Sequence, residues 1–143
     1  MYKNILIATD GSDLAMSAVR NGVALAKSVG AKITAVTISE PFRWVGPALT
    51  AIAEDAVRQG TRRAAEAAVD AAFDAATAAK VDCEKVIVED DFAYRGIVDT
   101  AAARNCDLIV MASHGRRGIS AVILGSETVK VLTHSKIPVL VCH

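Results

Sequence analysis

Two apolar stretches of this chain end alike, each passing into small polar residues and a glycine. The first is residues 5–11 (ILIATDG), and the second is residues 108–115 (LIVMASHG). If both stretches are parallel strands lying side by side, their carboxyl ends meet at one edge of the sheet. The sequence therefore predicts a polar cleft at that edge.

The residues after the second stretch have types that suit a phosphate. A bound phosphate needs converging backbone N–H groups, no Cβ in its way, and a helix amino terminus whose dipole favours negative charge. Gly115, with Gly125 and Ser126 at the start of a helical pattern, could supply these, and Arg116 or Arg117 could neutralise charge. Ser126 could cap the helix or bond the phosphate. A glycine-containing turn with an ordinary serine cap explains the same spacing equally well.

Three other groups of residues have chemistry to offer. Asp10 could bind Mg²⁺ through water, contact a nucleotide, or satisfy the first N–H groups of the following helix. Ser113 and His114 are a nucleophile and a base in type, but neighbours on a loop seldom face each other, so hydrolytic serine chemistry is not predicted. The acidic run 89–91 is interpreted as a solvated loop, with metal binding as the less favoured alternative. The chain has no Walker lysine and no evident catalytic base, which argues against fast phosphoryl transfer.

The elements that must position these residues follow from the hydrophobic pattern. Five short apolar runs predict strands at residues 5–9, 33–38, 81–88, 108–112 and 137–142. The first, fourth and fifth runs are nearly continuous, which is typical of strands covered on both faces. Helical patterns lie between the runs: from a cap at Ser12 or Asp13 to a stop at Gly30, over 49–79, around 97–102, and over 126–134.

Alternation of strands and helices predicts an α/β fold with one doubly wound, five-stranded parallel sheet. In the order 3-2-1-4-5, the winding reverses between the first and fourth strands, and ligands bind at such a point. The irregular stretch 40–47 is predicted to be either a lid or contact surface, or a packed connection; the sequence favours neither.

Composition limits the partners and the compartment. With 143 residues the chain is expected to form a single domain, residues 1–143. Its 16 basic and 16 acidic side chains balance, so nucleic acid is not an expected partner. The first apolar run is too short for a signal peptide or a membrane span, and Cys83, Cys106 and Cys142 suit buried, reduced thiols. We therefore expect a cytoplasmic protein with no membrane contact.

Several segments together resemble the universal stress protein family. Residues 112–115 (ASHG), nine further residues, and then Gly125 and Ser126 are similar to the family's ATP-binding signature, Gly-x2-Gly-x9-Gly-Ser/Thr. The likeness extends to residues 3–12 (KNILIATDGS), 106–115 (CDLIVMASHG) and 137–141 (IPVLV). In one departure, Ala112 stands where the signature has its first glycine.

The resemblance implies a Rossmann-like fold of the HUP type and an ATP site, with Mg²⁺ or Mn²⁺ as the accompanying metal. In that site Asp10 and the backbone near Ala8 and Val36 flank the adenosine, while His114 to Arg116 and Gly125 to Glu127 hold the phosphates. The full set of expected binding residues is Ala8, Thr9, Asp10, Val36, Met111, Ala112, Ser113, His114, Gly115, Arg116, Gly125, Ser126 and Glu127.

A homodimer through the strand 137–142 is the expected assembly. Pro138 fits an edge strand because proline cannot donate to a central ladder. A bare apolar edge would be an aggregation hazard, and pairing with a second copy would remove it. The resemblance points to the same contact.

These observations predict an ATP-binding stress-response module. It would act as a homodimeric, nucleotide-dependent switch with at most slow hydrolysis, read by an unknown signalling partner. The alternative is a homodimeric interaction protein that does not bind nucleotide, for which Ala112 is the best argument. A dedicated ATPase is the less favoured third interpretation.

Overall fold

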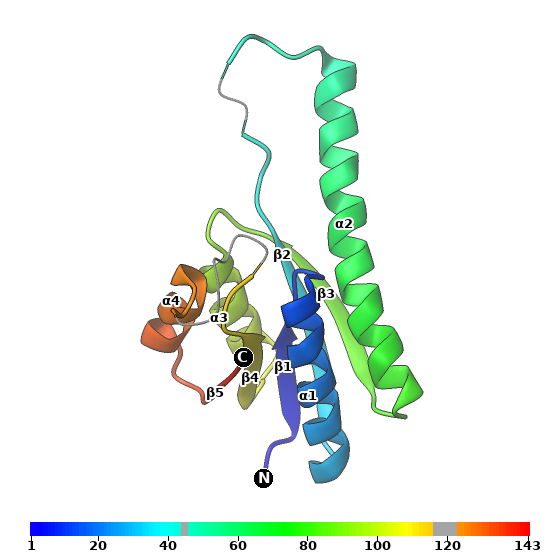
Figure 1. Cartoon of the computed structure of the whole chain (residues 1–143), viewed down its shortest axis with the longest axis vertical. Coiled ribbons are helices and arrows are strands. Elements are labelled where there is room, and N and C mark those ends of the chain that lie inside the picture. Colours follow the sequence, from blue (N-terminus) through cyan, green and yellow to red (C-terminus); the bar gives the residue numbers. More distant parts are fainter. Residues whose placement is uncertain (44–45, 116–122) are drawn as a thin grey trace.

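The core of the protein is one parallel sheet (Figure 1). The computed structural model describes residues 1–43, 46–115 and 123–143, and over these residues five strands pair in the order β3-β2-β1-β4-β5. This confirms the predicted fold and strand order. The strands are β1 (Asn4–Ala8), β2 (Lys32–Ser39), β3 (Cys83–Glu89), β4 (Leu108–Ala112) and β5 (Val139–Cys142).

Four helices connect the strands within the described residues. They are α1 (Asp13–Val29), α2 (Ala51–Ala78), α3 (Ala93–Ala103) and α4 (Ser126–His134). Helix α1 begins after Ser12, whose side chain accepts a hydrogen bond from the Ala15 N–H, and it ends at Gly30 in the left-handed conformation with φ 72°. The predicted cap and stop of this helix are therefore confirmed.

The helices form a layer on each face of the sheet. On β1, Ile5 and Ile7 pack with residues of α1 and α2, whereas Leu6 and Ala8 pack with residues of α3 and α4. Alternate residues of a strand point to opposite faces, so a strand covered on both sides has a nearly continuous apolar sequence. Every residue of β1 and of β4 is buried, as their continuous apolar runs predicted.

The fifth strand differs from the prediction in two ways. It begins at Val139 rather than at residue 137, and only its last residue, Cys142, is buried. Leu140 is 40% exposed, so the expectation that this strand is covered on both faces is wrong for the single chain. The physical reason is its place at the sheet edge, where its open side has no neighbouring strand.

The cysteines are free thiols of unequal burial. Cys106 and Cys142 are buried, but Cys83, at the start of β3, is only partly buried, which corrects the expectation for that residue. Burial raises the pKa of the Cys106 and Cys142 thiols. Both therefore act as small apolar side chains in the core.

Helix α2 extends beyond the sheet at the carboxyl ends of the strands (Figure 1). Residues 51–64 carry no buried position, and burial starts at Ala65. Despite its length, α2 is not apolar enough to cross a membrane, and neither is any other helix in the described part of the chain.

Close packing of α1 on the sheet depends on Gly22, and this yields a stability prediction. A Cβ at Gly22 would lie 2.6 Å from Ile7 Cδ1, whereas a Cβ at Gly60 on α2 would meet no described atom within 4 Å. Gly22→Leu should lower the free energy of unfolding by about 1–3 kcal/mol, since it overpacks the core. Gly60→Leu should stay within about 0.5 kcal/mol of wild type or gain slightly, because leucine favours helix. Urea unfolding of both variants checks this, and equal losses would contradict it.

Candidate functional site

A cleft of about 940 Å³ lies at the carboxyl ends of β1, β2 and β4. The structure brings most of the expected binding residues to this one place. Those that line the cleft are Ala8, Thr9, Asp10, Val36, Met111, Ala112, His114, Gly115, Gly125, Ser126 and Glu127. Ser113 is not among them, because it is buried with only 3% of its surface exposed. Arg116 and Arg117 lie outside the described residues.

The end of β1 is shaped by polar contacts to β2 and α1. The Thr9 N–H donates to the Val36 carbonyl oxygen at 3.0 Å, and the Thr37 hydroxyl donates to the Thr9 carbonyl oxygen at 2.8 Å. The Ser12 N–H donates to Asp10 Oδ1 at 2.9 Å, so Asp10 closes the turn before α1. The capping contact of α1 itself comes from Ser12 and not from Asp10. The Ser12 N–H thereby fixes the Asp10 carboxylate at the cleft.

The end of β4 and the start of α4 are joined by hydrogen bonds. The Gly125 N–H donates to the Ser113 carbonyl oxygen at 2.7 Å. The Thr128 hydroxyl, on a side chain that is 2% exposed, lies 3.1 Å from both the Ala112 and the Ser113 carbonyl oxygens. A Cβ at Gly125 would lie 3.1 Å from His114 Cα, so only glycine allows this approach without displacement. These contacts hold the first turn of α4 against the end of β4.

This junction offers backbone donors to an anion. The first N–H groups of a helix have no acceptors within the helix, and the helix dipole adds partial positive charge there. Ser126 and Glu127, the first two residues of α4, both line the cleft. Gly125, which has no side chain, is the N-cap of α4, and Ser126 is the first residue inside the helix, so the alternative in which Ser126 caps this helix is wrong. Chemically, the arrangement can bind a phosphate or another anion.

Two small residues of the signature have distinct environments. Ala112 is the last residue of β4 and pairs with Cys142, and it is not among the residues with positive φ. Its methyl group therefore adds no backbone strain where the signature has glycine. Gly115 lies against Asp10: a Cβ there would be 2.6 Å from Asp10 Oδ2. Any larger residue at 115 must displace that carboxylate.

The structure corrects the expectation for Ser113 and His114. Their side chains do meet, with Ser113 Oγ 3.2 Å from His114 Nδ1, because both residues lie in the bend that follows β4. The serine is nevertheless buried away from the cleft, whereas His114 lines it. The contact thus positions the imidazole and leaves the hydroxyl without access to a bound substrate.

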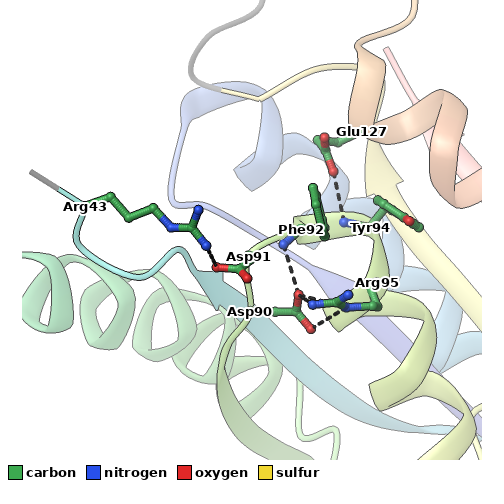
Figure 2. Close-up of polar contacts among 7 residues, drawn as sticks. All are labelled: Arg43, Asp90, Asp91, Phe92, Tyr94, Arg95 and Glu127. Atoms are coloured by element: carbon green, nitrogen blue, oxygen red, sulfur yellow. Dashed lines mark hydrogen bonds and ion pairs between the residues drawn. The ribbon is translucent and has the colours of Figure 1, made fainter. Parts of the chain in front are cut away.

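The acidic run after β3 is engaged by arginines (Figure 2). Arg95 donates to Asp90, whose Oδ1 also accepts the Phe92 N–H at 2.9 Å. The Arg95 contact and then the Phe92 N–H hold the pKa of Asp90 below its usual range. Asp91 pairs with Arg43 at 2.6 Å. Among the residues that the structure describes, no three histidine, cysteine or acidic side chains are grouped as metal ligands.

Glu127 has a contact that sequence reasoning missed. Its Oε2 accepts the Tyr94 N–H at 2.9 Å, and its Oε1 lies 3.1 Å from Lys130 Nζ (Figure 2 shows the first contact). The side chain therefore caps α3, a helix whose own N-cap, Phe92, makes no side-chain capping bond. The signal in the sequence is Phe92 itself, which has no side-chain acceptor and leaves the first N–H groups of α3 to other acceptors.

The cleft also has lining residues that the sequence did not single out as binding residues. They lie in the segment after β2, in the exposed first half of α2 and in the β3–α3 connection. They include Pro41, Phe42, Arg43, Thr61, Asp91 and Phe92. Of the stretch left open as a lid or a packed connection, residues 40–43 thus border the cleft. Trp44 and Val45 lie outside the described residues.

Comparison with known proteins gives the family. The sequence profile described as the Universal stress protein family matches residues 1–143, the whole chain. The chain belongs to the universal stress protein family. A universal stress protein of Methanocaldococcus jannaschii is 29% identical over 148 residues, covering 99% of this chain and 82% of the relative.

Solved structures of universal stress proteins share the fold. One, in complex with cAMP, is 28% identical with a TM-score of 0.74, covering 99% of this chain and 97% of that one. Another, from Arabidopsis thaliana with AMP bound, is 16% identical with a TM-score of 0.70, covering 98% of this chain and 90% of that one. The identity of the second is low, so it supports the fold alone.

The buried Thr128 hydroxyl yields a prediction for this universal stress protein. Thr128→Val keeps the shape but removes the donor to two buried carbonyl oxygens, which should lower the free energy of unfolding by about 1–3 kcal/mol. Thr133→Val, on the same helix, is the matched control, since the exposed Thr133 hydroxyl donates only to the Val129 carbonyl. That variant should change stability by less than about 0.5 kcal/mol. Urea unfolding compares them, and a Thr128→Val protein as stable as Thr133→Val would be the contrary result.

Proposed function

We propose that this universal stress protein is an adenine-nucleotide-binding module whose ligand is ATP with Mg²⁺ or Mn²⁺. The observation that carries the proposal is the junction of β4 and α4, where backbone donors of α4 open into the cleft beside the ends of β1 and β4. Such a junction binds phosphate through oriented N–H groups and the helix dipole. The cAMP complex of a relative supports an adenine nucleotide as the ligand.

In this proposal the ligand spans the cleft. The phosphates bind the N–H groups at Ser126 and Glu127, with His114 beside them. The adenosine lies toward Ala8, Val36 and Met111, whose apolar surfaces line the other part of the cleft. Apolar walls with a few convergent polar groups are the usual composition of such sites.

The proposed activity is that of a switch and not of an efficient enzyme. Ser113 is buried, and the acidic groups after β3 are occupied by arginines, so the described residues offer little to activate an attacking water. Hydrolysis is then at most slow, and binding alters the surface around the end of β4 and the start of α4, which a signalling partner reads. The alternative without nucleotide is weakened because Ala112 occupies an ordinary strand position.

We also propose a cytoplasmic homodimer through the β5 edge. The two edges of the sheet differ in chemistry: β3 exposes Glu84, Lys85 and Glu89, whereas β5 presents only Val139–Cys142, with Leu140 40% exposed. Charged side chains protect an edge strand from pairing, and an apolar edge without them favours pairing with a second copy. Free thiols fit a reducing compartment.

Titration calorimetry with Mg-ATP tests the nucleotide site. Wild type should release heat, and Gly115→Asp should abolish binding, because the new carboxylate clashes with Asp10 and repels phosphate. Ala112→Gly should bind with an affinity within about twofold of wild type, since Ala112 is an ordinary strand residue without positive φ. Gly60→Asp, at an exposed position of α2 that is not itself among the residues lining the cleft, is the matched control and should bind normally.

Two results would refute the nucleotide site. They are a wild type without heat and a folded Gly115→Asp variant with unchanged affinity. Cooperative unfolding of each variant in urea confirms that loss of binding is not loss of fold.

Light scattering at micromolar concentration tests the dimer. Leu140→Glu places a charge on the proposed interface and should weaken dimerisation by at least about 100-fold, because a carboxylate would be buried without a partner. Ile87→Glu on the opposite edge, where Ile87 is also 40% exposed, is the control and should leave the mass unchanged. A monomeric wild type, or a dimeric Leu140→Glu, would exclude this interface.

A further inference from the structure

The described lining of the cleft carries more acidic than basic side chains. Among its described lining residues are four carboxylates, Asp10, Glu40, Asp91 and Glu127, and one arginine, Arg43, which is already paired with Asp91 at 2.6 Å. Sites for several phosphates usually carry more positive than negative side chains. Carboxylates of the described residues thus lie at the cleft in which the phosphates are proposed to bind, while Arg116 and Arg117 lie outside the described residues.

Glu127 has both a backbone N–H in the first turn of α4 and a negatively charged side chain. Its own N–H is in the first turn of α4, and its carboxylate is one side chain away, at the amino end of α3 (Figure 2). A phosphate bound to the first turn of α4 must share that region with this carboxylate. Their repulsion increases with each negative charge on the ligand.

The carboxylate of Glu127 is held in place. Its Oε2 accepts the Tyr94 N–H at 2.9 Å, and the dipole of α3 favours a negative charge there. If the side chain turned away, the amino end of α3 would lose this cap, since Phe92 provides none. A bound nucleotide therefore meets a fixed charge and not a mobile one.

Lys130 does not remove this charge from the cleft. Its Nζ contacts Glu127 Oε1 at 3.1 Å, but Lys130 lies three residues further along α4 and is not a lining residue. The same ammonium sits 5.6 Å from the centroid of the Tyr94 ring. It is thus on the side of Glu127 that faces α3, and the ion pair is solvent-exposed and weak.

We propose that Glu127 is a charge filter for the phosphate end of the ligand. It makes the binding of a nucleoside triphosphate depend on a divalent cation, and it lets a nucleoside monophosphate bind without one. Free ATP carries about two more negative charges than AMP, and a divalent cation removes about that difference. This inference rests on the proposed nucleotide site and assigns the residue that sets its charge preference.

Glu127→Gln separates charge from structure. The amide oxygen still accepts the Tyr94 N–H, so the cap of α3 is kept while the negative charge is lost. Glu84→Gln is the matched control: it makes the same change in net charge on β3, where Glu84 pairs with Arg104 outside the cleft.

Calorimetric affinities for ATP and AMP, each in EDTA and in excess Mg²⁺, give the readout. In EDTA, wild type and Glu84→Gln should bind ATP at least about tenfold more weakly than AMP, and Mg²⁺ should restore ATP binding. In EDTA, Glu127→Gln should reduce the ratio of the ATP to the AMP dissociation constant by at least about threefold relative to wild type. Its affinity for AMP should stay within about twofold of the wild-type value.

The opposite results have separate meanings. If Glu127→Gln left the ratio of ATP to AMP affinity in EDTA unchanged, or lowered both affinities equally, the proposed role of Glu127 would be wrong while the nucleotide site would stand. A wild type that binds neither ATP nor AMP would overturn the proposed function and the filter together.

Discussion

The functional end of this protein depends on the short hydrogen bond between the Gly125 N–H and the Ser113 carbonyl oxygen. It connects the bend after β4 to the start of α4. The buried Thr128 hydroxyl adds contacts to the Ala112 and Ser113 carbonyl oxygens at the same place. Without this junction, the free N–H groups of α4 would have no fixed position relative to β1 and β4. With it, a helix amino terminus and two strand ends share one cleft.

The sheet can hold this junction rigidly because its central strands are buried on both faces. The helices approach closely where glycine replaces a side chain: a Cβ at Gly96 of α3 would lie 2.7 Å from Ile38 Cδ1, much as a Cβ at Gly22 would contact Ile7. Tight helix packing on buried strands leaves little freedom at the strand ends. The binding residues at those ends are therefore preorganised by the core and not by the loops.

The described residues place carboxylates, and not only backbone donors, at the proposed phosphate site. The Glu127 carboxylate accepts the Tyr94 N–H of α3, and the same residue lies in the first turn of α4 and lines the cleft. The cap of α3 therefore brings a negative charge to the amino end of α4. Arg43 and Asp91 similarly connect the β2–α2 segment to the β3–α3 segment at the border of the cleft. The stability of α3 and the electrostatics of the site are thus coupled through the same few side chains.

Apolar periodicity, the Ser12 cap and Gly30 indicate the element types along the chain, because these signals act locally on the backbone. The alternation of strands and helices indicates the doubly wound sheet, and parallel strands that end together bring Asp10 and Gly115 to one edge. The positions of His114 and Glu127 in the site came from the family resemblance. The burial of Ser113, the N-cap role of Gly125 and the contact of Glu127 with Tyr94 depend on tertiary packing. Those contacts join residues 12 to 33 positions apart. Their geometry is set by how sheet and helices pack in three dimensions, which no spacing along the chain encodes.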